Sequence, residues 1–333
     1  MSLKAIIYGV GPIGSLITKY AIMKGYEIIG AIDIDPSKVG RDLGDIIGLG
    51  EKLGVIVTSN PEHAFKPVKP DIVFHATTSW LNKALPQLVT TIKNKVNIIS
   101  TCETLSYPYY RYPHLAELLD NYAKVHGVTV LGTGINPGFL LDTLPAVLSL
   151  PHVRVDKIIA IRSIDAGKRR KSFQKKIGLS LAPEEFKDKL SKGELTAHVG
   201  YAESVYLIAE MLGIKLTKVE EGQEPVIAGE GEELKTPYYE IKPGQVKGVK
   251  GFGKGLVGDK EVIRIEFHAI VGNDEYEEIK IEGEPTITWR STGTPGDIGT
   301  AAVVVNIAPR VIELEPGLKT MADLVKATFT LLK

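Results

Sequence analysis

Three segments of this chain combine residue types that suit chemistry, and each follows a short apolar run that predicts a buried β-strand. Residues 9–14 read Gly-Val-Gly-Pro-Ile-Gly, residues 101–103 read Thr-Cys-Glu, and residues 132–139 read Gly-Thr-Gly-Ile-Asn-Pro-Gly-Phe. Proteins with parallel sheets bind ligands beyond the carboxyl ends of their strands. We therefore expect the chemistry of this protein at its strand ends.

The first segment is a complete G-x-G-x-x-G between a predicted strand and a predicted helix, which is typical of dinucleotide binding. Its first glycine permits a tight turn, its second lets the backbone approach a pyrophosphate, and its third lets the helix pack closely on the strand. N–H groups at the helix N-terminus would donate to the phosphates. The residues predicted to bind them are Gly9, Gly11, Pro12, Ile13 and Gly14.

An acidic residue, Asp33, ends the second predicted strand. It lies about 20 residues after the glycine loop, where a carboxylate can accept hydrogen bonds from ribose hydroxyls. Its charge would repel a 2′-phosphate, which favours NAD. Lys38 and Arg41 follow closely and could accept that phosphate, which would favour NADP. The predicted cofactor is therefore NAD or NADP, with NAD favoured.

Small polar residues follow the fourth predicted strand. Ala76, Thr77 and Thr78 are expected to contact the cofactor. His75, the residue before them, could line the site or be a buried histidine whose hydrogen bonds are satisfied. Asn136, in the third segment, could constrain its loop or contact the nicotinamide.

Among the ends of the fourth, fifth and sixth predicted strands, only Glu103 places an acid immediately after a buried parallel strand. A carboxylate there would face the nicotinamide, where it could hold an amine, position a water molecule and transfer protons. The alternative is that Glu103 caps the next element or pairs with a lysine. Cys102 is expected to be a packed small residue, because no partner base is evident. Thr101 and Phe139 are candidate substrate contacts.

Six apolar runs alternate with helical patterns and predict an α/β domain with a Rossmann-type, doubly wound parallel sheet. These runs are residues 4–8, 27–32, 54–57, 71–76, 96–100 and 128–131. Beyond residue 153 the pattern changes to helices and to strands in which apolar and polar residues alternate, as in antiparallel strands with one solvated face, which predicts a second domain of α+β character. The predicted strands there are residues 157–164, 261–267 and 277–281. Residues 220–233 could be an ordered flap or a mobile loop.

The expected domains are residues 1–138 for dinucleotide binding and 139–296 for substrate binding and dimerisation. Residues 297–333 are expected to return to the first domain, because residues 297–314 form a helical pattern too apolar to stand alone. In the second domain, the basic run 168–171 is either a solvated surface or a clamp for a carboxylate or phosphate. His198, at a predicted helix start, could contact a ligand or have a structural role.

The composition is that of an ordinary globular protein, with 333 residues, 44% hydrophobic and 24% charged. Its 40 basic and 40 acidic residues cancel, so the charge does not indicate nucleic acid or an anionic membrane as a partner. One cysteine excludes an internal disulfide framework and a cysteine-based zinc site, and we predict no bound metal. No apolar stretch approaches a membrane span or a secretory leader, so a cytoplasmic protein is expected. Few Asn and Gln beside many Lys, Glu and Ile suggest a thermophilic source.

Taken together, these residues resemble the family of 2,4-diaminopentanoate dehydrogenases and native amine dehydrogenases. That family belongs to a broader group with a dihydrodipicolinate reductase-like N-terminal domain. The resemblance covers essentially the whole chain. The glycine loop is generic to the fold, whereas residues 100–108 (Ser-Thr-Cys-Glu-Thr-Leu-Ser-Tyr-Pro) and 132–139 are much more specific. Further segments that agree are residues 168–170, 174–178, 198–200, 203–204, 296–297 and 304–311.

The resemblance implies that Glu103 is the catalytic carboxylate and that the protein is a homodimer built through the second domain. It also implies oxidative deamination of a small-molecule amine or diamino acid. The implied reaction converts 2,4-diaminopentanoate to 2-amino-4-oxopentanoate and ammonia, and its reverse aminates a ketone. The substrate's carboxylate and second amine would then need partners in the second domain. The candidates are Arg162, Lys168, Arg169 and His198.

Three alternatives remain at this point. A dihydrodipicolinate reductase would carry a His-His pair, which is absent near residues 164–168. Another amino-acid dehydrogenase, such as one acting on meso-diaminopimelate, is not excluded. A non-catalytic NAD(P)-binding sensor is the third alternative, and the acid at the strand end disfavours it.

Overall fold

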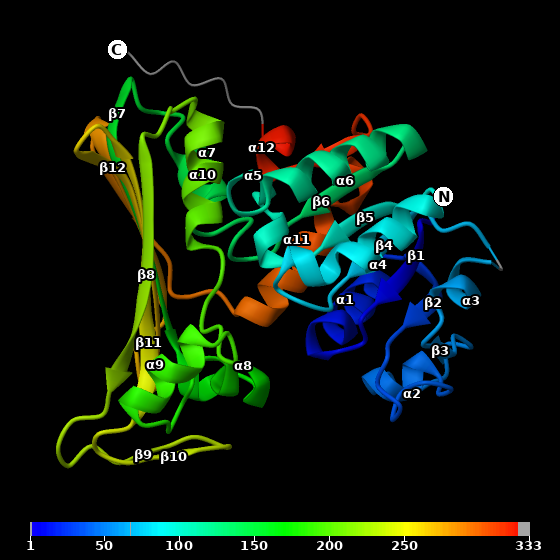
Figure 1. Cartoon of the computed structure of the whole chain (residues 1–333), viewed down its shortest axis with the longest axis horizontal. Coiled ribbons are helices and arrows are strands. Elements are labelled where there is room, and N and C mark those ends of the chain that lie inside the picture. The colour runs from blue at the N-terminus through cyan, green and yellow to red at the C-terminus, as the bar shows by residue number, and fades with distance from the viewer. Residues whose placement is uncertain (1, 67, 326–333) are drawn as a thin grey trace. The chain divides into compact units, whose positions relative to one another are not determined.

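The computed structural model describes residues 2–66 and 68–325 (Figure 1). Residues 326–333, part of the segment expected to return to the first domain, lie outside the described residues. Packing divides the chain into two units. The first unit comprises the described residues within Met1–Phe139 and Pro295–Lys326, and the second comprises Leu140–Thr294.

The first unit is built on a seven-stranded sheet in the order β15-β6-β5-β4-β1-β2-β3, and every strand pair in it is parallel. Its strands are β1 (Lys4–Tyr8), β2 (Glu27–Ile32), β3 (Val57–Thr58), β4 (Ile72–His75), β5 (Asn97–Ser100), β6 (Thr129–Gly132) and β15 (Gly317–Lys319). The strands are short and mostly buried, β4 and β6 throughout, as expected for a parallel sheet covered on both faces. The predicted Rossmann-type doubly wound sheet is confirmed.

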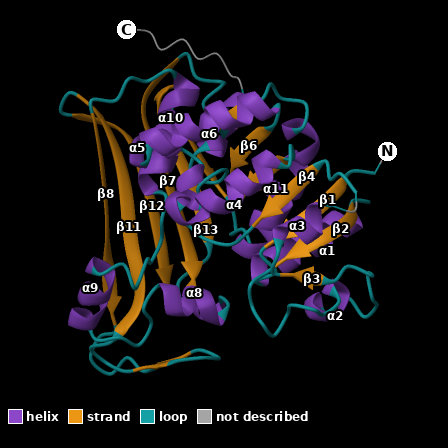
Figure 2. Cartoon of the chain, turned by 45° about the vertical axis from the view of Figure 1, so that its right-hand side comes forward, coloured by secondary structure: helices purple, strands orange, loops and turns teal. Residues whose placement is uncertain are grey.

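Helices connect these strands and pack on the sheet (Figure 2). They are α1 (Pro12–Met23), α2 (Leu43–Ile47), α3 (Pro61–Phe65), α4 (Leu81–Lys93), α5 (Pro108–Arg111), α6 (Pro113–His126), α11 (Gly296–Val311) and α12 (Met321–Leu324), with the 3-10 turn η1 (Glu103–Leu105). Helix α11 packs against α1, and the hydroxyl of Tyr26 donates to the carbonyl of Val305 at 3.0 Å. The apolar segment near the C-terminal end is thus covered by the first unit.

The structure differs from the predicted elements of this unit in three places. The third strand starts at Val57 rather than residue 54. The sequence pattern predicts a helix over residues 85–93, whereas helix α4 begins at Leu81 and accommodates Pro86 inside it. Strand β15 was missed because its three residues are too short to show a periodic pattern.

The second unit contains a six-stranded mixed sheet in the order β14-β13-β7-β12-β11-β8. Its strands are β7 (Arg154–Asp165), β8 (Lys218–Ile227), β11 (Val246–Val257), β12 (Lys260–Ile270), β13 (Tyr276–Glu284) and β14 (Ile287–Arg290), beside a small pair of β9 (Leu234–Lys235) and β10 (Glu240–Ile241). The predicted α+β character is confirmed. The pairing of β7 is only half as predicted, because it is antiparallel to β13 but parallel to β12.

One face of this sheet is covered by helices, and its core includes side chains of β7, β12 and the central helix of the unit. The helices are α7 (Thr143–Leu148), α8 (Lys171–Lys176), α9 (Pro183–Ser191) and α10 (Tyr201–Leu212), with the 3-10 turn η2 (Ala166–Lys168). Residues 220–233, left open as a flap or a loop, mostly belong to strand β8.

Strand β11 escaped prediction because its sequence, Val-Lys-Gly-Val-Lys-Gly-Phe-Gly-Lys-Gly-Leu-Val, is rich in glycine. The structure shows why the glycines are needed. A Cβ added at Gly251 would lie 2.1 Å from the Tyr201 hydroxyl, and one at Gly253 would lie 2.9 Å from the Tyr201 carbonyl. Glycine in a strand often marks the close approach of another backbone. Here it lets α10 lie directly on the sheet.

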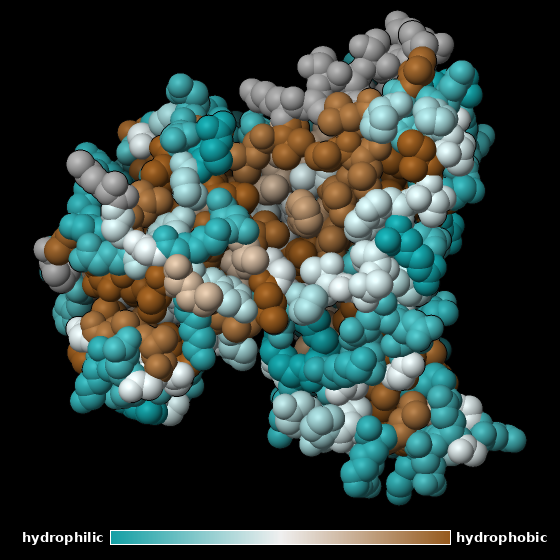
Figure 3. All heavy atoms as spheres, turned by 180° about the vertical axis from the view of Figure 1, so that it is seen from behind, coloured by the Kyte–Doolittle hydropathy of each residue, from teal (hydrophilic) through white to brown (hydrophobic). Residues whose placement is uncertain are grey.

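The surface carries both hydrophilic and hydrophobic residues. Figure 3 shows hydrophobic residues gathered between hydrophilic ones on the face it presents. Within the described ranges, no helix combines the length and the apolar character needed to cross a membrane.

Candidate active site

The last residues of five parallel strands form one row across the sheet of the first unit. Register pairs them in the order Ile32, Tyr8, His75, Ser100 and Gly132. The residues that follow continue the ladder, since each donates its backbone N–H across to the neighbouring strand end at 2.8–3.1 Å. The segments singled out from the sequence therefore start at the same level of one sheet edge.

The glycine loop leaves β1 at this edge. Gly9 has a φ of +97°, which the turn requires. A Cβ on Gly14 would lie 1.9 Å from the Gly9 carbonyl oxygen, so glycine is needed there for helix packing. Around Gly11, by contrast, a Cβ would meet no atom of the described chain within 4 Å. An open backbone position at the start of α1, where Pro12 and Ile13 form the first turn, fits a pyrophosphate.

Asp33 leaves β2 beside this loop. Its Oδ2 accepts the backbone N–H of Val10 at 2.7 Å, and its Oδ1 accepts that of Asp35 at 2.9 Å. Burial disfavours the charged form, but the two backbone donors and the Lys38 ammonium outweigh it and lower the pKa of Asp33. Asp33 is thus a fixed anion that ties the glycine loop to the end of β2.

The two cations that could favour NADP have different surroundings. The Lys38 ammonium lies 3.1 Å from Asp33 Oδ2 and 3.5 Å from Asp35 Oδ2, so its charge is paired. Arg41 donates to the Ser37 carbonyl at 3.1 Å from an exposed position. Both side chains lie in the loop after Asp33.

Glu103 begins the 3-10 turn η1 after β5, and its segment is bonded to the end of β4 and to the loop that follows β4. The N–H of Thr101 donates to the His75 carbonyl at 2.9 Å. The N–H and the hydroxyl of Thr104 both donate to the Ser79 carbonyl at 3.1 Å. The position of the acid is therefore set by main-chain bonds to the β4 loop.

The structure supports the packing role predicted for Cys102. Its side chain is buried, and burial raises the pKa of the thiol to about 12, helped by the negative charge of Glu103. A thiol with such a pKa is a poor nucleophile.

Gly132, the last residue of β6, begins the segment 132–139, but the sequence indicated no separate role for it. A Cβ there would lie 2.4 Å from the Leu105 carbonyl carbon and 2.6 Å from the Ser106 nitrogen. The turn that carries Glu103 thus rests directly on the backbone of β6. A packing contact of this kind leaves no signal in a single sequence.

The loop after β6 contains polar atoms with unusual surroundings. The side-chain oxygen and nitrogen of Asn136 and the hydroxyl of Thr133 are buried and have no hydrogen-bond partner among the described residues. Buried polar groups are normally bonded, so these atoms are suited to meet a ligand. Thr133 was missed from the sequence. Phe139 ends the same loop and is partly exposed.

On the β4 side, Ala76, Thr77 and Thr78 follow the last strand residue, as predicted. A Cβ on Gly9 would lie 2.5 Å from the Ala76 carbonyl oxygen and 2.8 Å from Thr77 Cγ2. The glycine loop and the β4 loop are therefore in direct contact. His75 itself is buried and bonded at both ring nitrogens.

In the second unit, Arg162 is buried in β7 on the helix-covered face. Its Nε lies 3.2 Å from Glu277 Oε1, and its guanidinium donates to the Thr294 carbonyl at 2.8 Å. Glu277 also accepts from the backbone N–H and the hydroxyl of Thr294, each at 3.1 Å. Part of the Arg162 charge is therefore balanced inside the unit, which the sequence did not indicate.

His198 lies against aromatic rings of the same unit, with Tyr201 at 4.8 Å and Phe267 at 4.5 Å between ring centroids. Burial, and then the positive charges of Lys176 and Arg162, hold the pKa of His198 well below its usual value. Lys176, on α8, was not singled out from the sequence. The positive charges of Lys176 and Arg162 thus act on the His198 imidazole and favour its neutral form.

The basic run 168–171 is spread out rather than gathered. The Lys168 side chain is 67% exposed and 3.8 Å from Asp165, whereas the Arg169 guanidinium stacks on the Phe173 ring at 5.1 Å. Buried Gln174 holds this turn, since its side-chain nitrogen donates to the carbonyls of Gly167 and Arg169 at 2.9 and 2.8 Å. Lys168 behaves as a solvated residue, which was the alternative considered from the sequence.

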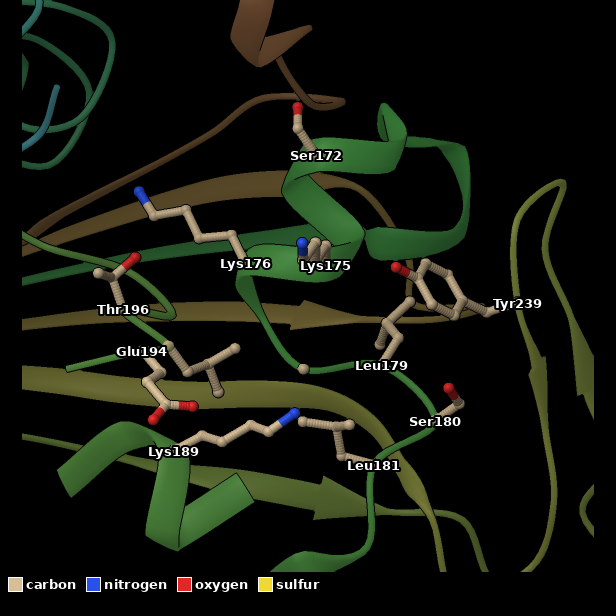
Figure 4. Close-up of a pocket in the computed structure, with 12 residues that line it drawn as sticks. Ser172, Lys175, Lys176, Leu179, Ser180, Leu181, Lys189, Glu194, Thr196 and Tyr239 are labelled. Atoms are coloured by element: carbon tan, nitrogen blue, oxygen red, sulfur yellow. The ribbon is translucent and has the colours of Figure 1, made fainter. Parts of the chain in front are cut away.

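A cavity of about 660 Å³ lies beside α8 and α9 in the second unit (Figure 4). Lys175 and Lys176 from α8 and Lys189 from α9 line it with apolar side chains such as Leu179 and Leu181. None of the site residues predicted from the sequence lines it. Lys176, which borders it, also acts on His198 through its charge.

We expect Gly132→Ala to destabilise the first unit, because the added methyl collides with the η1 backbone. Overpacking of this kind costs roughly 1–3 kcal/mol. Chemical denaturation of the purified variant measures the loss in free energy of unfolding. Gly134→Ala is the matched control, since its Cβ would approach Thr300 no closer than 3.5 Å. Equal stability of the two variants would contradict the packing role of Gly132.

Comparison with known proteins finds relatives that match almost the whole chain. Residues 139–331 match the family described as 2,4-diaminopentanoate dehydrogenase C-terminal domain. The chain is 33% identical to 2,4-diaminopentanoate dehydrogenase of Acetoanaerobium sticklandii, covering 96% of this chain and 93% of that protein. It is 22% identical to an amine dehydrogenase of Streptomyces virginiae, covering 97% and 96%.

A solved amine dehydrogenase from Mycobacterium smegmatis superimposes with a TM-score of 0.87 at 27% identity, covering 97% of this chain and 96% of that one. Both the sequence match and the structural match thus run through the two units. The resemblance inferred from the sequence is confirmed: the chain belongs to the 2,4-diaminopentanoate dehydrogenase family of amine-directed dehydrogenases.

Proposed function

We propose that this protein oxidatively deaminates 2,4-diaminopentanoate to 2-amino-4-oxopentanoate and ammonia with a nicotinamide cofactor. The observation that carries the proposal is the position of Glu103 just beyond the end of β5, in a segment bonded to β4 and to the loop that follows β4, in a chain of this family. The similarity to the Acetoanaerobium sticklandii enzyme over almost the whole chain supports the diamino acid as substrate.

The cofactor, when bound, supplies the hydride acceptor. Glu103 orients the substrate amino group while the C–H bond of the amine-bearing carbon breaks and an imine forms. The same carboxylate then takes a proton from a water molecule as its oxygen bonds to the imine carbon. Cleavage of the C–N bond releases ammonia and leaves the ketone. One amine, one water and one oxidised cofactor thus give one ketone, one ammonia, one reduced cofactor and one proton, which is released to solvent.

Thr133 and Asn136 are the proposed partners of the nicotinamide amide, because their side-chain polar atoms are buried and lack partners within the described chain. Holding the reacting atoms about 3–3.5 Å apart accounts for much of the rate in such reactions. Thr101 and Phe139, which flank the same edge, are proposed substrate contacts.

In the second unit we propose Arg162, Lys176 and His198 as the group that recognises the substrate carboxylate. This assignment is supported by the effect of the Lys176 and Arg162 charges on the pKa of His198, which they lower. The guanidinium fork of Arg162 suits a carboxylate, and Glu277 fixes its orientation. Arg169, anchored by its stack on Phe173, is a further candidate, whereas the exposure of Lys168 argues against it.

NAD is the proposed preferred cofactor. Asp33 is a fixed anion at the end of β2, and the nearest cation, Lys38, is paired with it. Its carboxylate can accept the ribose hydroxyls and would repel a 2′-phosphate. The expected cytosolic location and thermophilic source stay predictions.

A homodimer built on the second unit is also proposed. The face of the six-stranded sheet opposite the helices carries Ile159 and Ile161 of β7 among ion pairs such as Arg264–Glu266 at 2.6 Å. Charges of both signs around an apolar centre allow the same patch on two copies to pair about a twofold axis.

Replacing Glu103 by Gln is expected to lower kcat for 2,4-diaminopentanoate about 10³-fold, because Gln cannot accept the proton. NADH binding, followed by fluorescence, should change less than about twofold. Glu117→Gln, an exposed acid on α6, is the matched control. A near-native rate in Glu103→Gln would refute the assignment. A wild-type protein that binds NADH but oxidises neither 2,4-diaminopentanoate nor simple amines would instead be a sensor.

Replacing Asp33 by Ser is expected to shift cofactor preference towards NADP. Loss of hydrogen bonds to a charged group should lower kcat/KM for NAD about tenfold or more, while NADP no longer meets an anion. The ratio of kcat/KM for the two cofactors is the measurement. Asp35→Ser removes an equal charge from an exposed position two residues away and should leave the ratio nearly unchanged. Equal ratios in the two variants would show that Asp33 does not select the cofactor.

Light scattering should give the wild-type protein a mass of twice 36.2 kDa. Ile161→Asp places a charge at the centre of the proposed interface and should yield monomers. Val257→Asp, at the exposed end of β11, should remain dimeric. A monomeric wild type, or a dimer that persists in Ile161→Asp, would contradict the proposed interface.

A further inference from the structure

A buried histidine outside the proposed chemistry connects the two loops that meet at the sheet edge. His75 is 1% exposed and lies in β4 between Tyr8 of β1 and Ser100 of β5. Its Nδ1 lies 2.7 Å from the Ser100 hydroxyl, and its Nε2 lies 2.7 Å from Gln87 Oε1 and 3.0 Å from the Thr77 hydroxyl. Both ring nitrogens are therefore used, in opposite directions.

The donors and acceptors of this network determine the state of the ring. The Ser100 oxygen accepts the N–H of Cys102 at 3.1 Å, so its own proton is available for Nδ1. Gln87 Oε1 accepts the Thr77 hydroxyl at 2.6 Å and also the proton on Nε2. The assignment that satisfies every bond is a neutral imidazole with its proton on Nε2. Burial lowers the pKa of His75 to about 4, which keeps this form at neutral pH.

The two ends of the network lie in segments with different proposed roles. On one side Ser100 holds the backbone one residue before Glu103. On the other side, Thr77 belongs to the β4 loop. Its Cγ2 would lie 2.8 Å from a Cβ added at Gly9, so Thr77 contacts the glycine loop. A continuous chain of contacts thus runs from the glycine loop, through Thr77 and His75, to the catalytic segment.

We propose that His75 is a positioning residue that sets the cofactor loop and the Glu103 segment with respect to each other through its two ring nitrogens. The proposal rests on the proposed function for the roles of the two segments, but the bonds themselves belong to the fold. Each nitrogen serves one segment, so the two contributions are separable.

Two substitutions of His75 each keep the hydrogen bond of one ring nitrogen and remove that of the other. Asn in His75→Asn places a polar atom where Nδ1 lies, so it can accept from Ser100 but does not reach Gln87. Gln in His75→Gln places an N–H near the Nε2 position, so it keeps the bond to Gln87 and loses Ser100. Ser100→Ala and Thr77→Val remove the outer partner on each side. His63→Gln, on the exposed face of α3, is the matched control.

Three measurements follow each variant: the NADH dissociation constant by fluorescence, kcat for amine oxidation, and amide hydrogen exchange of the peptide spanning residues 100–106. The loss of one hydrogen bond is expected to change a dissociation constant or a rate constant about 2- to 10-fold. His75→Gln and Ser100→Ala should speed exchange in that peptide and lower kcat about tenfold, with NADH affinity within about twofold of the wild type. His75→Asn and Thr77→Val should weaken NADH binding about fivefold and lower kcat less than His75→Gln does.

Equal effects of His75→Asn and His75→Gln on all three measurements would overturn the proposal, as would wild-type values in both. Circular dichroism and thermal melting of every variant separate a loss of fold from a loss of positioning, and the Ser100 and Thr77 variants test the same two bonds if a His75 variant does not fold. If the wild type shows no amine turnover, the proposed function fails, while NADH affinity and hydrogen exchange still decide the link.

Discussion

The candidate site depends on one constraint, the parallel register that ends five strands in a single row. Because Ile32, Tyr8, His75, Ser100 and Gly132 pair across the sheet, the segments that follow them start at one level. Backbone bonds then continue the ladder by one residue beyond each strand. Slipping one strand by a single residue would turn its end towards the other face of the sheet. The segment that follows the slipped strand would then start about 3.3 Å out of line with its neighbours.

The rest of the first unit maintains this edge at close range. Gly14 lets α1 approach the glycine loop, and Gly132 lets the η1 turn rest on the end of β6. Asp33 binds the N–H of Val10, which fixes the loop to β2, and Thr104 binds Ser79, which fixes the turn to the β4 loop. Each of these contacts involves backbone atoms of a loop or turn, so the positions of the chemical groups follow from how the backbone packs. Such preorganisation is what a dehydrogenase needs, because misplacement of the reacting atoms costs rate steeply.

In the second unit, a helix packs closely on the sheet and a buried arginine is paired with a glutamate. Glycines along β11 bring α10 onto the sheet, and that helix carries Tyr201 against His198. The buried pair of Arg162 and Glu277 then keeps a cation on the covered face without leaving its charge unbalanced. Under the proposed function, this arrangement supplies the groups that distinguish one amine from another.

The sequence by itself determined the fold class, the glycine loop and the family, because periodic apolar runs and the spacing of glycines and acids are local properties. It also indicated that residues 132–139 and Glu103 belong to strand ends. Only the tertiary structure decided that Gly132 supports the turn of Glu103, that β11 is a strand, and that Lys176 acts on His198. These facts depend on contacts between residues far apart in the chain. The two bonds of His75 belong to the same class, since Gln87 and Ser100 meet one ring only after helix α4 and strand β5 have packed around it.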